Sequence, residues 1–175
     1  MGQEDSDSTE TTETTDTEVY SGKALMVYGD GFMYSVKAPK GWKGDTAISN
    51  EFYANIIFYE IEQDLVLERV VIQVYTFKKE SESLKEDLNG DIMNFREENK
   101  KAEEQDFSIS HSSYKCFSKL VFVKDNLYQY LVYVDPGRKY QSGVSISMNT
   151  HNRKAKESEL KALRKIVASL SMIKG

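Results

Sequence analysis

The sequence predicts an α+β fold, a three-layer α/β/α sandwich with a central, mainly antiparallel sheet. Short β-prone segments follow one another across tight turns, and antiparallel neighbours are joined in this way. Two other segments carry apolar residues at helical spacing, so each needs a surface to cover. The expected strand at 65–78 is apolar on both faces, with Val70, Ile72 and Val74 on one and Val71, Tyr75 and Phe77 on the other. It should therefore be covered on both sides.

Seven strands are expected. They span Lys23–Tyr28, Phe32–Ala38, Asn55–Glu62, Leu65–Lys78, Phe107–Val123 with an interruption, Leu127–Val134 and Gln141–Met148. Gly29-Asp30-Gly31 should join the first two as a hairpin, because Gly and Asp accept the positive φ angles of tight turns. Within 127–134, Tyr128 and Tyr130 share one face and Tyr133 lies on the other. These aromatics suit either a packed sheet face or an exposed binding face.

Two helices are expected between and after these strands. The first covers 81–105, with Ser81 or Ser83 as N-cap and an apolar stripe whose members are Leu84, Leu88, Ile92 and Phe95. Gly90 lies inside it and permits a kink or a break. The second helix spans Lys156–Ser171 and packs through apolar residues from Leu160 to Leu170.

The charge of the chain is concentrated at its N-terminus. Residues 1–18 hold seven acids and no base, whereas the other 157 residues hold 23 bases and 21 acids. A nearly neutral domain argues against nucleic-acid binding, which calls for a concentrated basic face. We therefore divide the chain into an acidic Ser/Thr-rich segment at 1–22 and a single domain at 23–175.

The acidic segment has no apolar residue between Met1 and Val19. It cannot offset its ordering entropy by burial, and we expect a disordered spacer. Such a tail is either an incidental terminus or a tether to a lipid-modified cysteine, with Met1-Gly2 standing where a signal peptide and that cysteine were removed. Tails of this composition resemble those of bacterial lipoproteins, so we favour an exported, periplasmic or cell-surface lipoprotein over a cytoplasmic protein.

The segment YSVKAPKGW, residues 34–42, runs from a strand into Pro-Lys-Gly-Trp. Pro39 lacks a backbone donor and should end the strand. Gly41 permits an unusual turn. Trp42, the only Trp of the chain, should then fold back as an apolar plug over a sheet edge or a helix base. The alternative is that Trp42 is an exposed contact residue.

This segment, after a Gly-Asp-Gly turn and followed by the expected order of elements, resembles the PsbP-like family. The same fold is shared by the Ran-binding Mog proteins. The resemblance covers most of residues 23–173, with its motif at 39–42 and a weaker match at Ile166–Leu170. It implies a protein that binds other proteins and does not catalyse, without naming a partner.

Motifs of catalysis and metal binding are absent from the sequence. There is no Gly-rich phosphate loop, no Gly-x-Ser-x-Gly and no Cys-x-x-Cys. We expect Cys116 to be a buried, inert thiol, with His111 on the opposite face of its strand. His111 and His151 have no metal-ligand spacing around them, and ordinary turn chemistry explains the acids in loops. No catalytic, cofactor or metal residue is assigned.

These observations favour a non-catalytic, monomeric protein-binding or assembly module, tethered to a bacterial envelope membrane by its acidic tail. The alternatives are a soluble cytoplasmic adaptor that binds a protein, and an enzyme with an unrecognised site. The candidate contacts are Arg138, Lys139 and Tyr140, which form a polar-aromatic loop after Asp135-Pro136-Gly137, together with Trp42.

Overall fold

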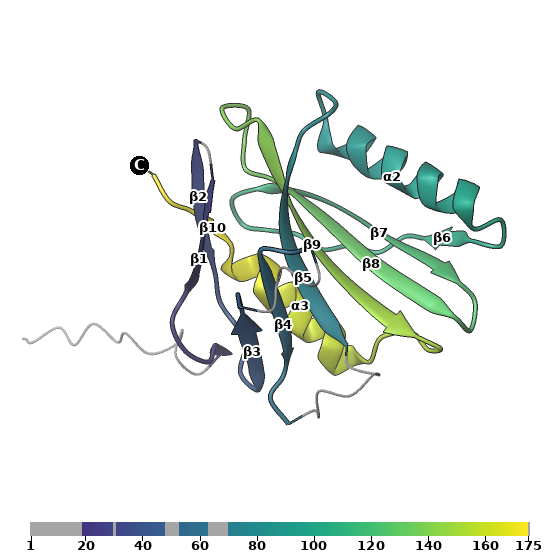
Figure 1. Ribbon diagram of the computed structural model, residues 1–175, viewed down its shortest axis with the longest axis horizontal. Helices are drawn as coiled ribbons and strands as arrows, with labels where there is room; N and C mark the ends of the chain where they lie inside the picture. Colours follow the sequence, from purple (N-terminus) through teal and green to yellow (C-terminus); the bar gives the residue numbers. More distant parts are fainter. Residues whose placement is uncertain (1–18, 30, 48–52, 63–69, 175) are drawn as a thin grey trace, which may run out of the picture.

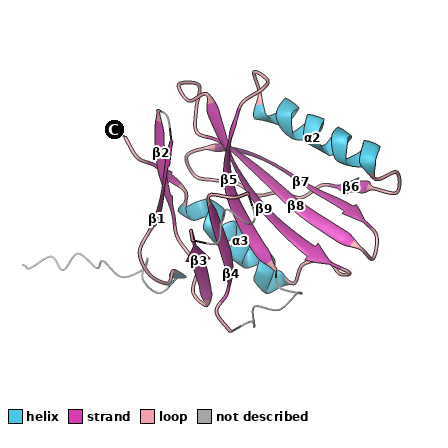
Figure 2. Cartoon of the chain, in the orientation of Figure 1, coloured by secondary structure: helices cyan, strands magenta, loops and turns pink. Residues whose placement is uncertain are grey.

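The computed structural model describes residues 19–29, 31–47, 53–62 and 70–174. In these residues the larger of two sheets has seven strands in the order β3-β4-β5-β9-β8-β7-β6, and all neighbours are antiparallel. Figures 1 and 2 show this sheet as the centre of the molecule. Its strands are β3 (Trp42–Asp45), β4 (Ile56–Glu60), β5 (Val71–Lys78), β6 (Glu103–Gln105), β7 (Lys115–Val123), β8 (Leu127–Asp135) and β9 (Ser142–His151). The predicted α+β class is confirmed.

Two helices, α2 (Leu84–Glu98) and α3 (Glu157–Ser169), cover opposite faces of this sheet. The alternation of β8 shows which side chains meet which helix. Tyr130 and Val132 belong to the cluster that contains the buried residues of α3, whereas Leu131 and Tyr133 pack in the cluster that contains Leu84, Leu88 and Ile92 of α2. The three predicted layers follow, and α2 runs through Gly90 without a break.

A second, three-stranded sheet has the order β1-β2-β10, and a single central sheet was therefore an incomplete prediction. It consists of β1 (Leu25–Gly29), β2 (Phe32–Val36) and β10 (Ser171–Met172). Its inner face packs into the same core as α3, and the Tyr34 hydroxyl lies 2.8 Å from that of Thr76 on β5. Burial raises the pKa of Tyr34 to about 12, as expected for a phenol in the interior.

Pro-Lys-Gly-Trp switches the chain from the small sheet to the large one. The Trp42 N–H donates to the Pro39 carbonyl at 2.9 Å, and Gly41 has φ +83°, so the chain turns at once after β2. Trp42 then pairs with Glu60 as the first residue of β3, a strand that the sequence did not predict. Trp42 is 5% exposed, inside the core that α3 covers.

Several element boundaries also differ from expectation. α2 ends at Glu98, because Asn99 closes it by donating its N–H to the Phe95 carbonyl, and β6 then occupies part of the expected helix. α3 ends at Ser169, and the next residues form β10. The interruption expected in 107–123 is a non-strand segment that reaches to the start of β7. Residues 1–18 of the expected disordered segment at 1–22, and the expected strand start at Leu65, lie outside the described residues. Within 19–22, Val19 and Ser21 are hydrogen-bonded to the backbone of Lys40 and Ala38.

Candidate interaction surface

A hollow of about 540 Å³ lies where the tip of the β1–β2 hairpin, the loop between β8 and β9, and the C-terminal segment meet. We call it the hairpin–loop hollow. Polar and apolar side chains both line it, and the described residues around it are Gly29, Gly31, Phe32, Met33, Lys139, Tyr140, Ile173 and Lys174. Three segments far apart in the sequence thus form one concave surface.

The hairpin that forms one wall is held by its turn and its pairing. Gly31 has φ +73°, a conformation that glycine adopts without strain. The Phe32 ring packs over Gly29 so closely that any Cβ there would clash at about 2.1 Å. On the other edge of β2, the Ile173 N–H donates to the Met33 carbonyl at 2.8 Å and extends the pairing of β10.

The facing loop is fixed by an ion pair beneath it. The Lys79 ammonium donates to Asp135 at 2.8 Å and to the Gly137 carbonyl at 3.1 Å, and the Gly137 N–H donates back to Asp135 at 2.9 Å. Burial by itself raises the pKa of Asp135, but these hydrogen bonds outweigh it and hold the pKa below its ordinary value. Tyr140 is therefore presented from an ordered turn.

An apolar row on the outer face of the small sheet leads into the hollow. Tyr28 pairs with Met33, and Met33 accepts from Ile173, so the three side chains lie side by side on one face of the sheet. Tyr28 is 72% exposed. This row was not predicted, although the alternation in β1 places Met26 and Tyr28 on the face opposite Val27.

The charged side chains that the structure describes at the hollow are of one sign, and Asp30, which stands between Gly29 and Gly31 in the sequence, lies outside the described residues. Its two ionisable side chains other than Tyr140 are those of Lys139 and Lys174, and no acid of the described chain lines it. Neither lysine takes part in an ion pair in the described part of the chain. The Lys139 ammonium lies 4.9 Å from the centre of the Tyr140 ring, a cation–π contact on the rim.

The four residues expected as contacts fall into three places. Lys139 and Tyr140 line the hairpin–loop hollow. Arg138, the residue before them, lines a separate hollow of about 370 Å³ on the other side of the loop, beside Lys115 and Phe117. Trp42 offers no side-chain surface to a partner because it is buried, so it is not part of the candidate surface.

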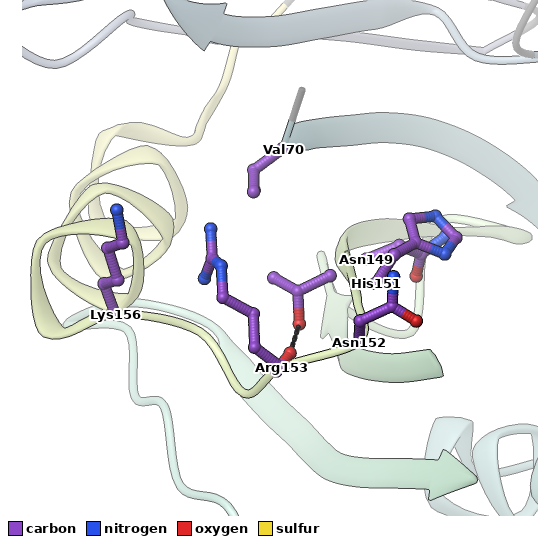
Figure 3. Close-up of a pocket in the computed structure, with 7 residues that line it drawn as sticks. Val70, Asn149, His151, Asn152, Arg153 and Lys156 are labelled. Atoms are coloured by element: carbon purple, nitrogen blue, oxygen red, sulfur yellow. Dashed lines mark hydrogen bonds between the residues drawn. The ribbon is translucent and has the colours of Figure 1, made fainter. Parts of the chain in front are cut away.

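A second polar hollow, of about 400 Å³, lies at the corner between β9 and α3 (Figure 3). Its lining includes Arg153 and Lys156, which project toward the same space in the picture. The Arg153 guanidinium is already paired: it donates to both carboxylate oxygens of Glu159, at 2.9 and 2.7 Å. Burial raises the pKa of Glu159, but the bonds from Arg153 and from the Lys156 N–H outweigh this and keep it low. At this corner Glu159 already neutralises the charge of Arg153.

A third hollow, of about 460 Å³, is basic and has no aromatic residue among those that line it. Lys100, Lys101 and Lys124 surround it together with Glu103, Ala102 and Val123. It combines cations with no aromatic side chain, and one acid lies among them. It therefore lacks the anchor that the hairpin–loop hollow provides in Tyr140 and Met33.

The surroundings of Cys116 and of His111 favour structural roles for both side chains. Burial raises the pKa of the Cys116 thiol to about 11, which leaves little nucleophilic thiolate at neutral pH. His111 lies in the loop before β7 and not on the strand itself. Its Nδ1 accepts from the Ser113 and Tyr114 N–H groups, so Nε2 carries the proton and donates to the Leu170 carbonyl at 2.9 Å.

The part of the chain that the structure describes contains no group of three or more His, Cys, Asp or Glu placed to hold a metal ion. None of its helices is long and apolar enough to span a bilayer. Burial and the hydrogen bond that the Tyr133 hydroxyl of β8 donates to the Asp91 carboxylate of α2 raise the pKa of Tyr133. That bond ties α2 to the sheet.

Comparison with known proteins gives a structural likeness and no sequence match. No family model matches the sequence, and no curated protein matches it. The structure is similar to the solution structure of cyanobacterial PsbP (CyanoP) from Synechocystis sp. PCC 6803, with 17% sequence identity over 86% of this chain and 92% of that one and a TM-score of 0.49.

Proposed function

We propose that the protein is a non-catalytic binding or assembly module whose partner is another protein, and that the hairpin–loop hollow is its contact surface. One observation carries this: Met33, Ile173 and Tyr140 line one concave surface together with Lys139 and Lys174, and neither lysine has an ion-pair partner among the described residues. Aromatic and Met side chains are enriched at protein interfaces. Two acids with lowered pKa values, Asp135 and Glu159, are already paired within the fold: Asp135 with Lys79 and Glu159 with Arg153.

The tether belongs to the same proposal. The described chain begins at Val19, whose carbonyl accepts from the Lys40 N–H, and Tyr20 forms a bridge to Pro39. The hairpin tip lies at the other end of β1, a strand of five residues that spans roughly 16 Å. A module held at Val19 by an acidic spacer on an envelope membrane would present the hairpin–loop hollow on the side away from its attachment.

Site-directed photo-crosslinking tests the binding function. A photoreactive phenylalanine analogue replaces Tyr140 in the full chain, expressed in its own cells, and replaces Met93 in a matched control. Met93 is 63% exposed on α2, away from the hollow. We expect one protein to crosslink at Tyr140 and not at Met93, and to bind again when both purified proteins are mixed. Crosslinking that is absent, or equal at the two positions, would refute the proposed surface.

The mass of the native N-terminal peptide tests the tether. A diacyl- or triacyl-modified cysteine before Gly2 would support the envelope location. An unmodified Met1 would remove it, and the cytoplasmic adaptor would become the leading alternative. The binding surface would stand in either case, because it depends on residues of the folded domain.

A further inference from the structure

We infer that the hairpin–loop hollow and the Tyr28–Met33–Ile173 row bind an acidic, apolar-anchored segment of the partner. By this we mean a stretch with one or two large apolar side chains flanked by Asp or Glu. The inference rests on the proposed function and adds the chemistry of the partner to it.

The apolar part of the surface supplies the anchor site. Met33 and Ile173 belong both to the row and to the hollow, so the apolar surface is continuous from Tyr28 into the concave region. The volume of about 540 Å³ is within the range of about 300–1,000 Å³ that small ligand sites occupy. A flexible Met beside a rigid aromatic adapts to an inserted side chain.

The charged part of the surface selects acids. Lys139 and Lys174 stand at the rim without an ion-pair partner among the described residues, and no described acid lines the hollow. A partner that placed Lys or Arg beside Lys139 and Lys174 would meet like charges there, whereas one with Asp or Glu gains attraction and faster encounter. Both lysines border the apolar surface, so the partner needs its acids next to its anchor.

Two other occupants fit less well. A second copy of the chain, docked through the same surface about a two-fold axis, would bring the two pairs of lysines together. The protein's own residues 1–18 carry seven acids but no apolar residue between Met1 and Val19. That segment matches the rim and has nothing to fill the hollow. A partner segment with both properties matches the whole surface.

Selection from a displayed library of random 16-residue peptides tests this inference on the full chain. We expect the enriched peptides to combine acids with a large apolar residue. A synthetic copy should lose about tenfold in affinity to the Lys139→Glu, Lys174→Glu double variant, and a similar factor to Tyr28→Ser. The matched control Lys124→Glu reverses the charge of an exposed lysine that lines the third hollow. Its affinity for the peptide should stay within about twofold of the parent value.

The remaining results overturn the inference and say which occupant replaces it. Enrichment of neutral or basic peptides, no enrichment, or equal losses in the double variant and the control would refute the acidic partner. A dimer in sedimentation that the double variant dissociates would assign the surface to a second copy. A tenfold gain in peptide affinity on deletion of residues 1–18 would assign it to the tail. Crosslinking at Tyr140 in cells would still leave the binding function in place.

Discussion

The corner between β9 and α3 and the hairpin–loop hollow both contain basic side chains, but among the described residues only the corner contains an acid that pairs with one of them. At the corner, Glu159 is 1% exposed and takes two hydrogen bonds from Arg153. At the hollow, Lys139 and Lys174 have no such partner among the described residues. A buried acid with its base stabilises this fold, whereas exposed bases beside apolar side chains are available to another molecule. The distinction separates structural charges from candidate contact charges.

Trp42→Ala should have the largest effect on the buried side of this comparison. Its side chain is 5% exposed in the core, so its removal leaves a cavity. We expect the free energy of unfolding to fall by about 3–5 kcal/mol, measured by urea denaturation. Tyr28→Ala, at a position 72% exposed, should cost no more than about 0.5 kcal/mol. Similar losses in both variants would show that Trp42 is not a core residue.

Glu159→Gln should have the next largest effect, because it leaves the Arg153 charge without its counter-ion. Removing one member of a buried pair costs about 3–5 kcal/mol, and Arg153 keeps 40% of its side chain exposed, so we expect about 2–3 kcal/mol. Urea denaturation at pH 7 measures it. The outcome against this account is a variant as stable as the parent, which would mean that the corner contributes nothing.

The same carboxyl predicts a loss of stability in acid. The pKa of Glu159 is lowered in the folded protein, so its contribution is fully present above the unfolded-state pKa, near 4.3. It disappears as the pH falls through the lower folded-state value. The stability difference between the parent and Glu159→Gln should therefore shrink from pH 7 to pH 3. A difference that is constant with pH would show that the carboxylate charge is not what stabilises the corner.

Deletion of residues 1–18 should have the smallest effect. A spacer that makes no contact with the domain leaves the melting temperature within about one degree of the parent value. Differential scanning calorimetry at low and at physiological salt measures it. A drop of several degrees, greatest at low salt, would mean that the acidic segment docks on the domain.

Local patterns predicted the parts of the fold that depend on alternation. In β8 they placed Tyr128 and Tyr130 on one face and Tyr133 on the other, and the structure packs them in two different clusters. β3 and β10 have four and two residues, too few to show a period. Pro39 predicted that β2 ends at Ala38, and the strand ends two residues earlier, at Val36. The next sheet depends on the pairing of Trp42 with Glu60, eighteen residues away.

Of the residues that line the hairpin–loop hollow, only Lys139 and Tyr140 were predicted from the sequence. The turn residues after β8 singled out Lys139 and Tyr140, because a polar-aromatic loop is visible in one short segment. Met33 and Ile173 are 140 residues apart in the chain, and only the pairing of β2 with β10 brings them together. The pairing of Arg153 with Glu159 likewise needs the turn into α3, although an acid three residues after the N-cap Lys156 is a local sign of helix capping.

The affinity of the partner captured at Tyr140, measured with purified proteins, tests the central claim most directly. Lys139→Glu and Lys124→Glu each reverse the charge of one exposed lysine that lines a hollow. Only the hollow of Lys139 also has Met33 and Tyr140 in its lining. The account predicts about tenfold weaker binding for Lys139→Glu and a change within about twofold for Lys124→Glu. Equal losses, or a larger loss for Lys124→Glu, would contradict the assignment of the hairpin–loop hollow as the contact surface.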